Sequence, residues 1–190
     1  MFTENGKVCT AAFCKTVVLQ KAVLGSVVSA HAENGFQLAG SAVLDADGLI
    51  FASPVYEMCP TPQMAAFLSR FRGGWVVLSK NPDAHAKQVG GCIAVGGTRN
   101  GGQEHVINSL MGWFHTNGYT PANGGLCMYA GASVWSQDKG AEGAAADEEG
   151  MIRCRRLGQK VARLAKALKD TDVFDTPPIK VFELSKVEKN

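Results

Sequence analysis

The sequence shows no strong charge imbalance and no long apolar run. Nineteen lysines and arginines stand against seventeen aspartates and glutamates, which leaves a formal net charge of +2 at pH 7. Dedicated nucleic-acid-binding domains are usually far more basic. No stretch provides the ~20 apolar residues that span a bilayer, and the opening MFTENGKVCT lacks the basic-then-apolar layout of a secretory signal. We therefore expect a cytoplasmic protein that binds neither nucleic acid nor a membrane.

Recognisable metal-binding spacing is also missing. None of the six cysteines form a C-x-x-C pair, and the four histidines are scattered singly, so neither a zinc ribbon nor a compact iron–sulfur motif is supported. Cys9 and Cys14 are five residues apart and remain candidates for half of a metal site. The simpler interpretation is that the cysteines are buried, reduced thiols, and no metal ligand is assigned.

Glycine is abundant, with 22 in 190 residues, and the chain is long enough for one domain with a substantial core. The apolar run 48–53 (GLIFAS) is typical of a strand buried on both faces of a sheet. Thr61 and Pro62 have the residue types preferred at the start of a helix. That helix carries an apolar stripe and is expected to end at 73–74 (GG).

A second strand–loop–helix unit follows the first. Residues 92–95 (CIAV) predict a short buried strand, and an amphipathic pattern predicts a helix from about Gln103 to 117–118 (NG). Two such units in succession imply parallel strands with right-handed crossovers. Ligands of open α/β sheets bind beyond the carboxyl ends of the strands, so loops 53–61 and 96–102 are the candidate site.

The remaining segments are less regular. Residues 119–150 are loop-rich, which indicates a ligand-covering loop or a flexible excursion. A final helix is expected to begin near Asp147, with an apolar face and seven basic residues over 153–169 that we interpret as a solvated face. The valine-rich segment 17–30 fits a buried helix or a strand.

The glycine loop does not match the common nucleotide motifs. Neither the P-loop pattern G-x-x-x-x-G-K-[ST] nor G-x-G-x-x-G is present around residues 96–102, and Ser53 is not in a G-x-S-x-G elbow. A Cys59 nucleophile with His105 or His115 is an alternative without a supporting motif. A backbone-built site at a helix N-terminus instead suits a flat redox ring such as a flavin. The other alternative is a pair of tight loops without a ligand.

Three segments carry a resemblance to a known family. ADGLIFASPVY (46–56) resembles the central motif of flavodoxin-like NADPH-dependent FMN reductases, and IAVGGTRNGGQE (93–104) is similar to the second flavin loop of their iron–sulfur-flavoprotein-like branch. DEEGMIRCRRLGQKVARLA (147–165) resembles that branch's closing helix. The resemblance covers about residues 44–168.

This resemblance implies a three-layer α/β/α fold with a twisted five-stranded parallel sheet that binds FMN at its carboxyl edge. It further implies hydride transfer from NAD(P)H through the flavin to a quinone, another flavin or a similar acceptor, in a homodimer or homotetramer. No catalytic acid or base is assigned. The implied cofactor-binding residues are Pro54, Val55, Tyr56, Glu57 and Met58 on one side of the ring, and Gly96, Gly97, Thr98, Arg99, Asn100, Gly101 and Gly102 on the other.

The N-terminal segment 1–44 departs from the family pattern. The expected apolar strand and the Ser/Thr/Asn-rich loop for the FMN phosphate are not recognisable. Either residues 3–6 (TENG) are a remnant of that loop and 7–31 the first helix, or residues 1–34 replace the whole unit. We therefore expect one domain over 1–190, with a first strand that is missing or rebuilt, no cysteine cluster and a tail over 171–190. A non-enzymatic, shortened relative that binds FMN weakly or not at all, and acts through a partner chain, is the alternative function.

Overall fold

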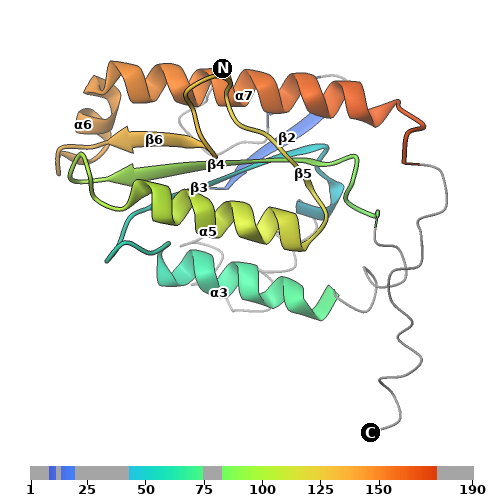
Figure 1. The fold of residues 1–190 in the computed structure, drawn as a ribbon, viewed down its shortest axis with the longest axis horizontal. Helices are drawn as coiled ribbons and strands as arrows, with labels where there is room; N and C mark the ends of the chain where they lie inside the picture. Colours follow the sequence, from blue (N-terminus) through green and yellow to red (C-terminus); the bar gives the residue numbers. More distant parts are fainter. Residues whose placement is uncertain (1–8, 12–13, 20–42, 75–82, 175–190) are drawn as a thin grey trace, which may run out of the picture.

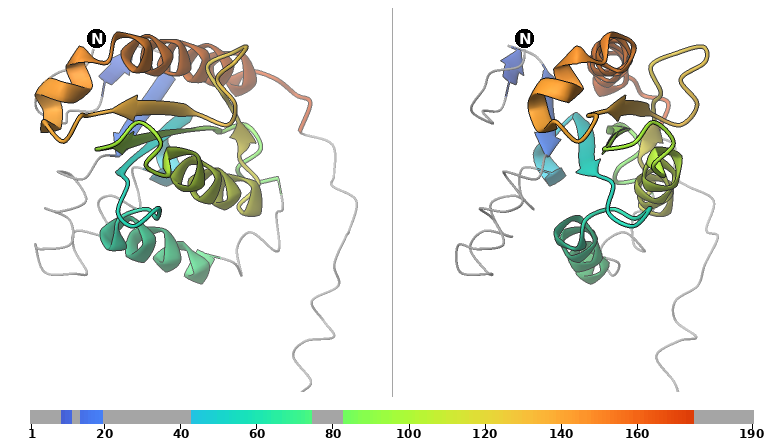
Figure 2. Two further views of the ribbon diagram at one scale, coloured as in Figure 1. Left: turned by 60° about the vertical axis from the view of Figure 1, so that its left-hand side comes forward. Right: turned by 90° about the vertical axis from the view of Figure 1, so that its left-hand side faces the viewer.

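The computed structural model describes residues 9–11, 14–19, 43–74 and 83–174, and these form three layers (Figure 1). Helix α7 covers one face of the sheet, and α3 and α5 cover the other; the end-on view in Figure 2 separates the layers. The α/β/α architecture expected from the sequence is thus confirmed. The elements are β1 (Cys9–Ala11), β2 (Cys14–Leu19), β3 (Gly48–Pro54), α3 (Pro62–Arg70), the 3₁₀ turn η1 (Phe71–Gly74), β4 (Val89–Gly96), α5 (Gln103–Thr116), β5 (Thr120–Pro121), β6 (Ala132–Trp135), α6 (Gly140–Ala146) and α7 (Glu148–Lys169).

The described sheet has six strands, of which β2, β3 and β4 are successive parallel neighbours. Both β5 and β6 pair with β4 in parallel: Thr120 lies opposite Val89, and Ala132 lies opposite Ile93. They therefore share one position in the sheet, and the chain leaves the sheet between them. The implied sheet of five parallel strands is corrected accordingly, since β1 also adds an antiparallel partner to β2.

The place beside β3 is filled, so the hypothesis of a missing first strand is wrong. Strand β2 runs parallel to β3, with Val17 opposite Leu49. A first helix over 7–31 is likewise incorrect for residues 14–19, where β-branched Thr16, Val17 and Val18 favour extended backbone. Residues 3–6 and 20–42, which include the expected phosphate loop, lie outside the described residues.

The strand expected at 92–95 begins three residues earlier, at Val89. Gly90 and Gly91 belong to it because each allows a helix to approach one face of the sheet. A Cβ at Gly90 would overlap the Phe114 ring of α5, and one at Gly91 would lie 3.1 Å from Leu157 of α7. The β3 run is fully covered on both sides, as predicted: Leu49, Ile50 and Phe51 are at most 1% exposed.

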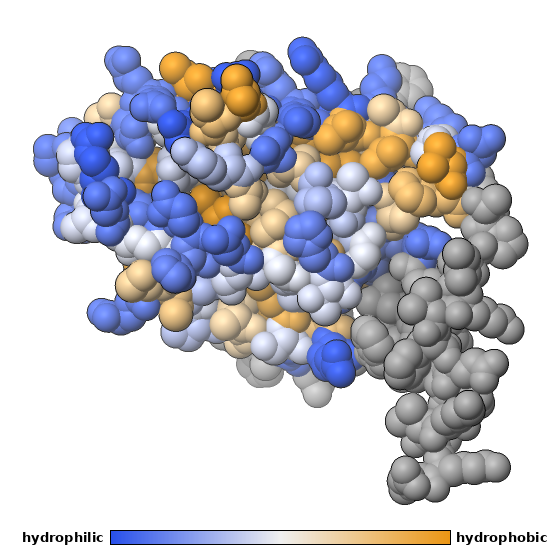
Figure 3. Space-filling model, in the orientation of Figure 1, coloured by the Kyte–Doolittle hydropathy of each residue, from blue (hydrophilic) through white to orange (hydrophobic). Residues whose placement is uncertain are grey.

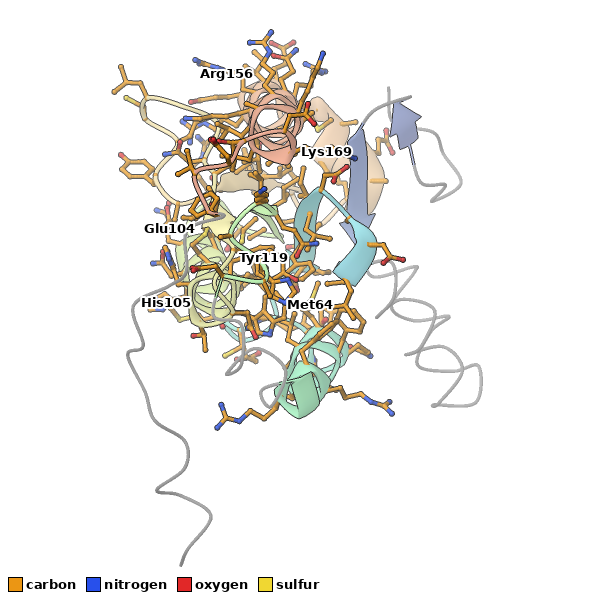
Figure 4. The ribbon with its side chains drawn as sticks, turned by 90° about the vertical axis from the view of Figure 1, so that its right-hand side faces the viewer. Met64, Glu104, His105, Tyr119, Arg156 and Lys169 are labelled. Carbon is orange, nitrogen blue, oxygen red and sulfur yellow. The ribbon has the colours of Figure 1, made fainter. Side chains whose placement is uncertain are left out.

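The two faces of the sheet carry separate cores. The core beneath α3 and α5 is rich in aromatic rings, with Phe51 stacked on Phe114 at 4.6 Å between centroids. Figure 4 shows Met64 and Tyr119 directed into this interior, while His105 and Arg156 point outward. The core beneath α7 is aliphatic and includes the predicted face of that helix, with Leu157, Val161 and Ala165 buried and Leu164 and Leu168 partly buried.

Residues 119–150 are more ordered than the sequence indicated. Strand β6 has four residues, and α6 is built largely from glycine and alanine, so neither gives a readable apolar period. The excursion 122–131 lies over α7 in Figure 1 and exposes Leu126 (86%) and Tyr129 (79%). On this face, hydrophobic groups are interrupted by hydrophilic ones (Figure 3).

The predicted helix boundaries near Thr61, Gln103 and Asp147 are confirmed. Thr61 Oγ1 accepts a hydrogen bond from Met64 N, and Asp147 caps α7 through Gly150 N. Five of the seven basic residues of α7 are exposed, in agreement with a solvated face. None of the described helices is long and apolar enough to cross a membrane. Of the expected tail over 171–190, the structure describes only the residues up to Phe174.

Candidate functional site

Three loops meet at the carboxyl edge of the sheet, after β3, β4 and β6. The β3 loop (55–61) touches the β4 loop (97–102), since a Cβ built on Gly102 would lie 3.0 Å from Met58. The β4 loop is joined to the end of β6 by a hydrogen bond from Trp135 Nε1 to Gly97 O at 2.9 Å. The structure therefore brings the two predicted loops together and adds a third, the β6 loop (136–139).

The β3 loop contains a tight hairpin turn with unfavourable backbone angles. Tyr56 and Cys59 exchange two backbone hydrogen bonds of 3.0 and 2.8 Å, and Glu57 and Met58 between them have φ values of 49° and 64°. Consecutive left-handed residues define a type I′ turn, which normally uses Asn and Gly. A non-glycine residue in the left-handed region costs about 1 kcal/mol or more of conformational free energy. Such strain concentrates at functional sites.

Buried Ser53 closes the base of this loop. Its hydroxyl accepts a hydrogen bond from Thr61 N at 3.1 Å and donates one to Pro54 O at 2.8 Å. The start of α3 is thus tied to the end of β3, so the strained turn is held from both sides. Tyr56 and Met58, 44% and 51% exposed, present apolar surface beside the β4 loop.

The β4 loop is shaped from within by the Gln103 side chain, which is 2% exposed. Its Oε1 accepts from Gly101 N at 2.8 Å, and its Nε2 donates to Thr98 O at 2.7 Å. One side chain therefore satisfies a donor and an acceptor of the loop. The predicted set 96–102 missed Gln103, although its position directly after the last glycine could have indicated this role.

The β6 loop packs closely against the glycines. Gly96 O accepts hydrogen bonds from Ser136 N at 2.8 Å and Ser136 Oγ at 3.2 Å. A Cβ at Gly97 would collide with the Asp138 carboxylate. Gln137 and Asp138 also have left-handed φ values, 56° and 54°. Packing against the β6 loop therefore requires glycine at position 97, whereas a Cβ at Gly96 would meet the side chain of Gln103.

Helix α5 begins directly at the site, and its first turn carries no side-chain cap. Gly102, at the N-cap position with φ of 99°, offers no side chain, and no described side chain replaces one there. The first N–H groups of a helix have no partner within the helix and lie at the positive end of its dipole. They can therefore donate hydrogen bonds to a ligand oxygen.

Arg99, assigned to this loop from the sequence, is directed toward β6. Its guanidinium carbon lies 4.5 Å from the centroid of the Trp135 ring. It lines a hollow of about 180 Å³ with Gln103, Trp135, Asp147 and Arg153. A second hollow of about 350 Å³ lies between the later turns of α3 and α5, away from all three loops.

The described cysteines and histidines form neither a Cys–His catalytic pair nor a metal site. Burial raises the pKa of Cys92 and raises that of Cys154 to about 11, whereas Cys59 and Cys127 are exposed, which corrects the expectation of buried thiols for these two. No hydrogen bond among the described residues joins Cys59 to His105 or His115. The described chain also contains no group of three or more His, Cys, Asp or Glu residues suited to a metal ion.

The sequence matches a family model over most of the described structure. Residues 11–132 match the model of the NADPH-dependent FMN reductases. An iron-sulfur flavoprotein of Methanocaldococcus jannaschii is 39% identical over 126 residues, which are 66% of this chain and 61% of that protein. An iron-sulfur flavoprotein of Archaeoglobus fulgidus is 38% identical over 125 residues, 65% of this chain and 60% of that protein. The aligned part is therefore about three fifths of each relative's length.

Solved structures resemble the fold at low sequence identity. A flavodoxin, WrbA-like protein from Agrobacterium tumefaciens gives a TM-score of 0.53 at 18% identity, covering 81% of this chain and 96% of that one. The Trp repressor binding protein from Bacillus subtilis also gives 0.53 at 18% identity, covering 75% and 97%. These similarities establish the flavodoxin-like fold.

Proposed function

This chain belongs to the NADPH-dependent FMN reductase family, and from that premise we propose that it is a flavin-dependent oxidoreductase that binds FMN at the three-loop edge. The observation that carries the proposal is the contact between the β3 and β4 loops at the uncapped start of α5. Both loops are the segments that resemble the family's flavin loops.

The described residues fit the ring of FMN. Exposed Tyr56 and Met58 provide apolar surface for a flat ring, while the glycines of the β4 loop let the backbone come close to it. The N–H groups at the start of α5 suit a carbonyl oxygen that gains negative charge on reduction. We expect the phosphate-binding segment directly after β2. The residues that follow β2, 20–42, lie outside those that the structure describes.

When bound, FMN supplies a ring that accepts a hydride and passes electrons on. The chain's own residues position it: the strained turn at Glu57 and Met58 fixes one wall, and Gln103 fixes the loop that forms the other. No side-chain acid or base is required by this arrangement. We further propose NAD(P)H as the hydride donor, a quinone, flavin or similar molecule as acceptor, and a cytoplasmic homodimer or homotetramer.

Titration with FMN tests the central claim. We expect quenching of flavin fluorescence at a one-to-one ratio, and bleaching of the bound flavin's absorption when NAD(P)H is added without oxygen. A protein that stays colourless in excess FMN would overturn the proposal and favour the shortened, non-enzymatic relative. Bound flavin that NAD(P)H cannot reduce would overturn the reductase activity alone.

Alkylation gives a second readout that does not depend on turnover. Cys59 lies in the β3 loop beside the proposed flavin wall, while Cys127 is a second exposed thiol, on the 122–131 excursion. We expect FMN to slow the reaction of Cys59 with iodoacetamide and to leave Cys127 unchanged, as followed by peptide mass spectrometry. Equal protection of both thiols, or of neither, would contradict the placement of the ring.

A further inference from the structure

We infer that the first turns of α7, residues 148–156, form a self-complementary surface on which a second copy of this chain docks, with a two-fold axis near Ile152. This contact rests on the proposed function and deepens it, because it names the face through which the copies of the proposed homo-oligomer meet. It requires no bound flavin.

Five exposed side chains form one stripe along these turns: Glu148, Glu149, Ile152, Arg155 and Arg156. The two acids precede Ile152 by four and three residues, and the two arginines follow it by three and four residues. Residues three or four apart lie on the same face of a helix, and Figure 4 shows Arg156 on this face pointing outward. Ile152, 50% exposed, is therefore an apolar centre between groups of opposite charge.

The stripe matches itself when the α7 helix of a second copy lies antiparallel to it. A two-fold axis beside Ile152 brings the two isoleucines together and sets the acids of each copy opposite the arginines of the other. Glu149 then faces Arg156 of the partner subunit, and Glu148 faces Arg155 of the partner subunit. Since a two-fold contact repeats every pair, it contains four pairs of opposite charge.

The charge pattern of α7 fixes where along the helix the axis lies. No aspartate or glutamate occurs over residues 150–169, whereas seven basic residues occur over 153–169. A two-fold axis at the middle of the helix would therefore set arginines and lysines against one another. Within α7, the turns around Ile152 are the part with acids on one side and bases on the other.

The charged groups of the stripe are accessible to a partner. The ion pairs among the described residues include neither Glu148 nor Arg155 nor Arg156. Glu149 pairs with Arg153 of its own helix, yet its side chain is 74% exposed. A carboxylate has two acceptor oxygens, so Glu149 can accept from a second arginine without losing the first.

Apolar surface next to the stripe enlarges the contact. The 122–131 excursion packs against α7 beside Arg156 and exposes Leu126 and Tyr129. The end-on view in Figure 2 shows this excursion beside α7, on the side opposite α6. Exposed ion pairs contribute little free energy each. We therefore expect Ile152, Leu126 and Tyr129 to supply most of the affinity, and the charges to set the register and select the partner.

Charge-reversal variants of the full chain test this contact by sedimentation velocity. We expect the wild type to self-associate. Arg155→Glu with Arg156→Glu sets acids opposite acids and should weaken self-association at least ~10-fold. Glu148→Arg with Glu149→Arg sets bases opposite bases and should have the same effect. An equimolar mixture of the two double variants restores opposite charges at all four pairs and should form a heterodimer.

Two further variants separate the contact from a general effect of charge. Asp170→Arg with Asp172→Arg, at exposed positions beyond the end of α7, changes the net charge as much as the reversal of the two glutamates does. These positions lie about 25 Å along the helix from Ile152, so self-association should not change. Ile152→Asp should weaken self-association and Ile152→Leu should retain it. Circular dichroism confirms that each variant is folded.

Three results would overturn the inference: a monomeric wild type, unchanged self-association in the charge-reversal and Ile152→Asp variants, or failure of the two folded double variants to associate when mixed. A monomeric wild type that binds polyglutamate through Arg155 and Arg156 would assign this face to an acidic protein instead. FMN titration of the same samples separates this inference from the flavin function. A dimer that binds no FMN refutes the flavin function alone, and a monomer that binds FMN refutes the contact alone.

Discussion

The carboxylate of Asp147 accepts a hydrogen bond from the backbone N–H of Trp135 at 2.8 Å, and its other oxygen accepts one from Gly150 N at 3.1 Å. One side chain thus caps α7 and satisfies a backbone N–H of β6, a four-residue strand that pairs only with β4 among the described strands. It joins the closing helix to the strand that supports the third loop of the site. Edge strands that are short and covered in this way resist pairing with other chains.

Replacing Asp147 with alanine should destabilise the fold. It removes both acceptors, and the loss of a cap together with a partly buried hydrogen bond costs about 2 kcal/mol of unfolding free energy. Urea denaturation followed by circular dichroism measures the change. Asp170→Ala, at the exposed carboxyl end of α7, is the control and should cost nothing, because an acid there opposes the helix dipole.

Gln103→Ala should loosen the β4 loop and weaken flavin binding. The substitution leaves Gly101 N and Thr98 O without their partner, and we expect a loss of about 1–3 kcal/mol in unfolding free energy. Gln103→Glu keeps the acceptor for Gly101 N but removes the donor to Thr98 O, so it should not restore the loop. Glu104→Ala, at the exposed neighbouring position, should leave flavin affinity unchanged; an equal loss in both variants would contradict the role of Gln103.

Two Gly→Ala substitutions, one at the N-cap of α5 and one in the middle of the helix, should have opposite effects. At Gly102 a methyl group meets left-handed backbone and lies 3.0 Å from Met58, so Gly102→Ala should destabilise the protein by about 1–2 kcal/mol. At Gly112, in the middle of the helix, a Cβ meets nothing within 4 Å. Gly112→Ala should therefore stabilise the protein by about 0.5–1 kcal/mol. Thermal unfolding of both variants would show melting temperatures on either side of the wild-type value.

His85 should make stability fall as the pH is lowered. It stacks on Tyr119 at 4.5 Å, and burial lowers its pKa below the ordinary 6.5, although a hydrogen bond to Gln88 opposes the shift. Since the folded state disfavours the protonated ring, this stabilisation is present above the unfolded-state pKa and is lost as the pH falls toward the folded-state value.

The comparison of His85→Phe with the wild type isolates this contribution. Phenylalanine keeps a ring against Tyr119 but cannot take up a proton. We expect the wild type to lose more unfolding free energy than His85→Phe between about pH 8 and about pH 5.5. A substitution at the exposed His115 controls for general effects, and identical pH profiles for wild type and His85→Phe would rule out the contribution.

The sequence alone determined the two central strand–loop–helix units, because their signals are local. The start of a helix follows from the local preferences of Thr61 and Pro62. Two buried strands follow from the apolar runs at 48–53 and 92–95. Parallel pairing then requires that loops 53–61 and 96–102 share the carboxyl edge. Their joint position was therefore predictable without coordinates.

The tertiary structure decided the features that depend on contacts between distant residues. Strand β2 exists as a strand through its pairing with β3, and β6 through its pairing with β4, and neither segment has a decisive local pattern. The direction of Arg99 depends on Trp135, which is 36 residues away along the chain and reaches the loop only through the sheet. The sequence located the glycine loop; its neighbours across the sheet determine which side of it lies against the β3 loop and which side faces the hollow lined by Arg99 and Trp135.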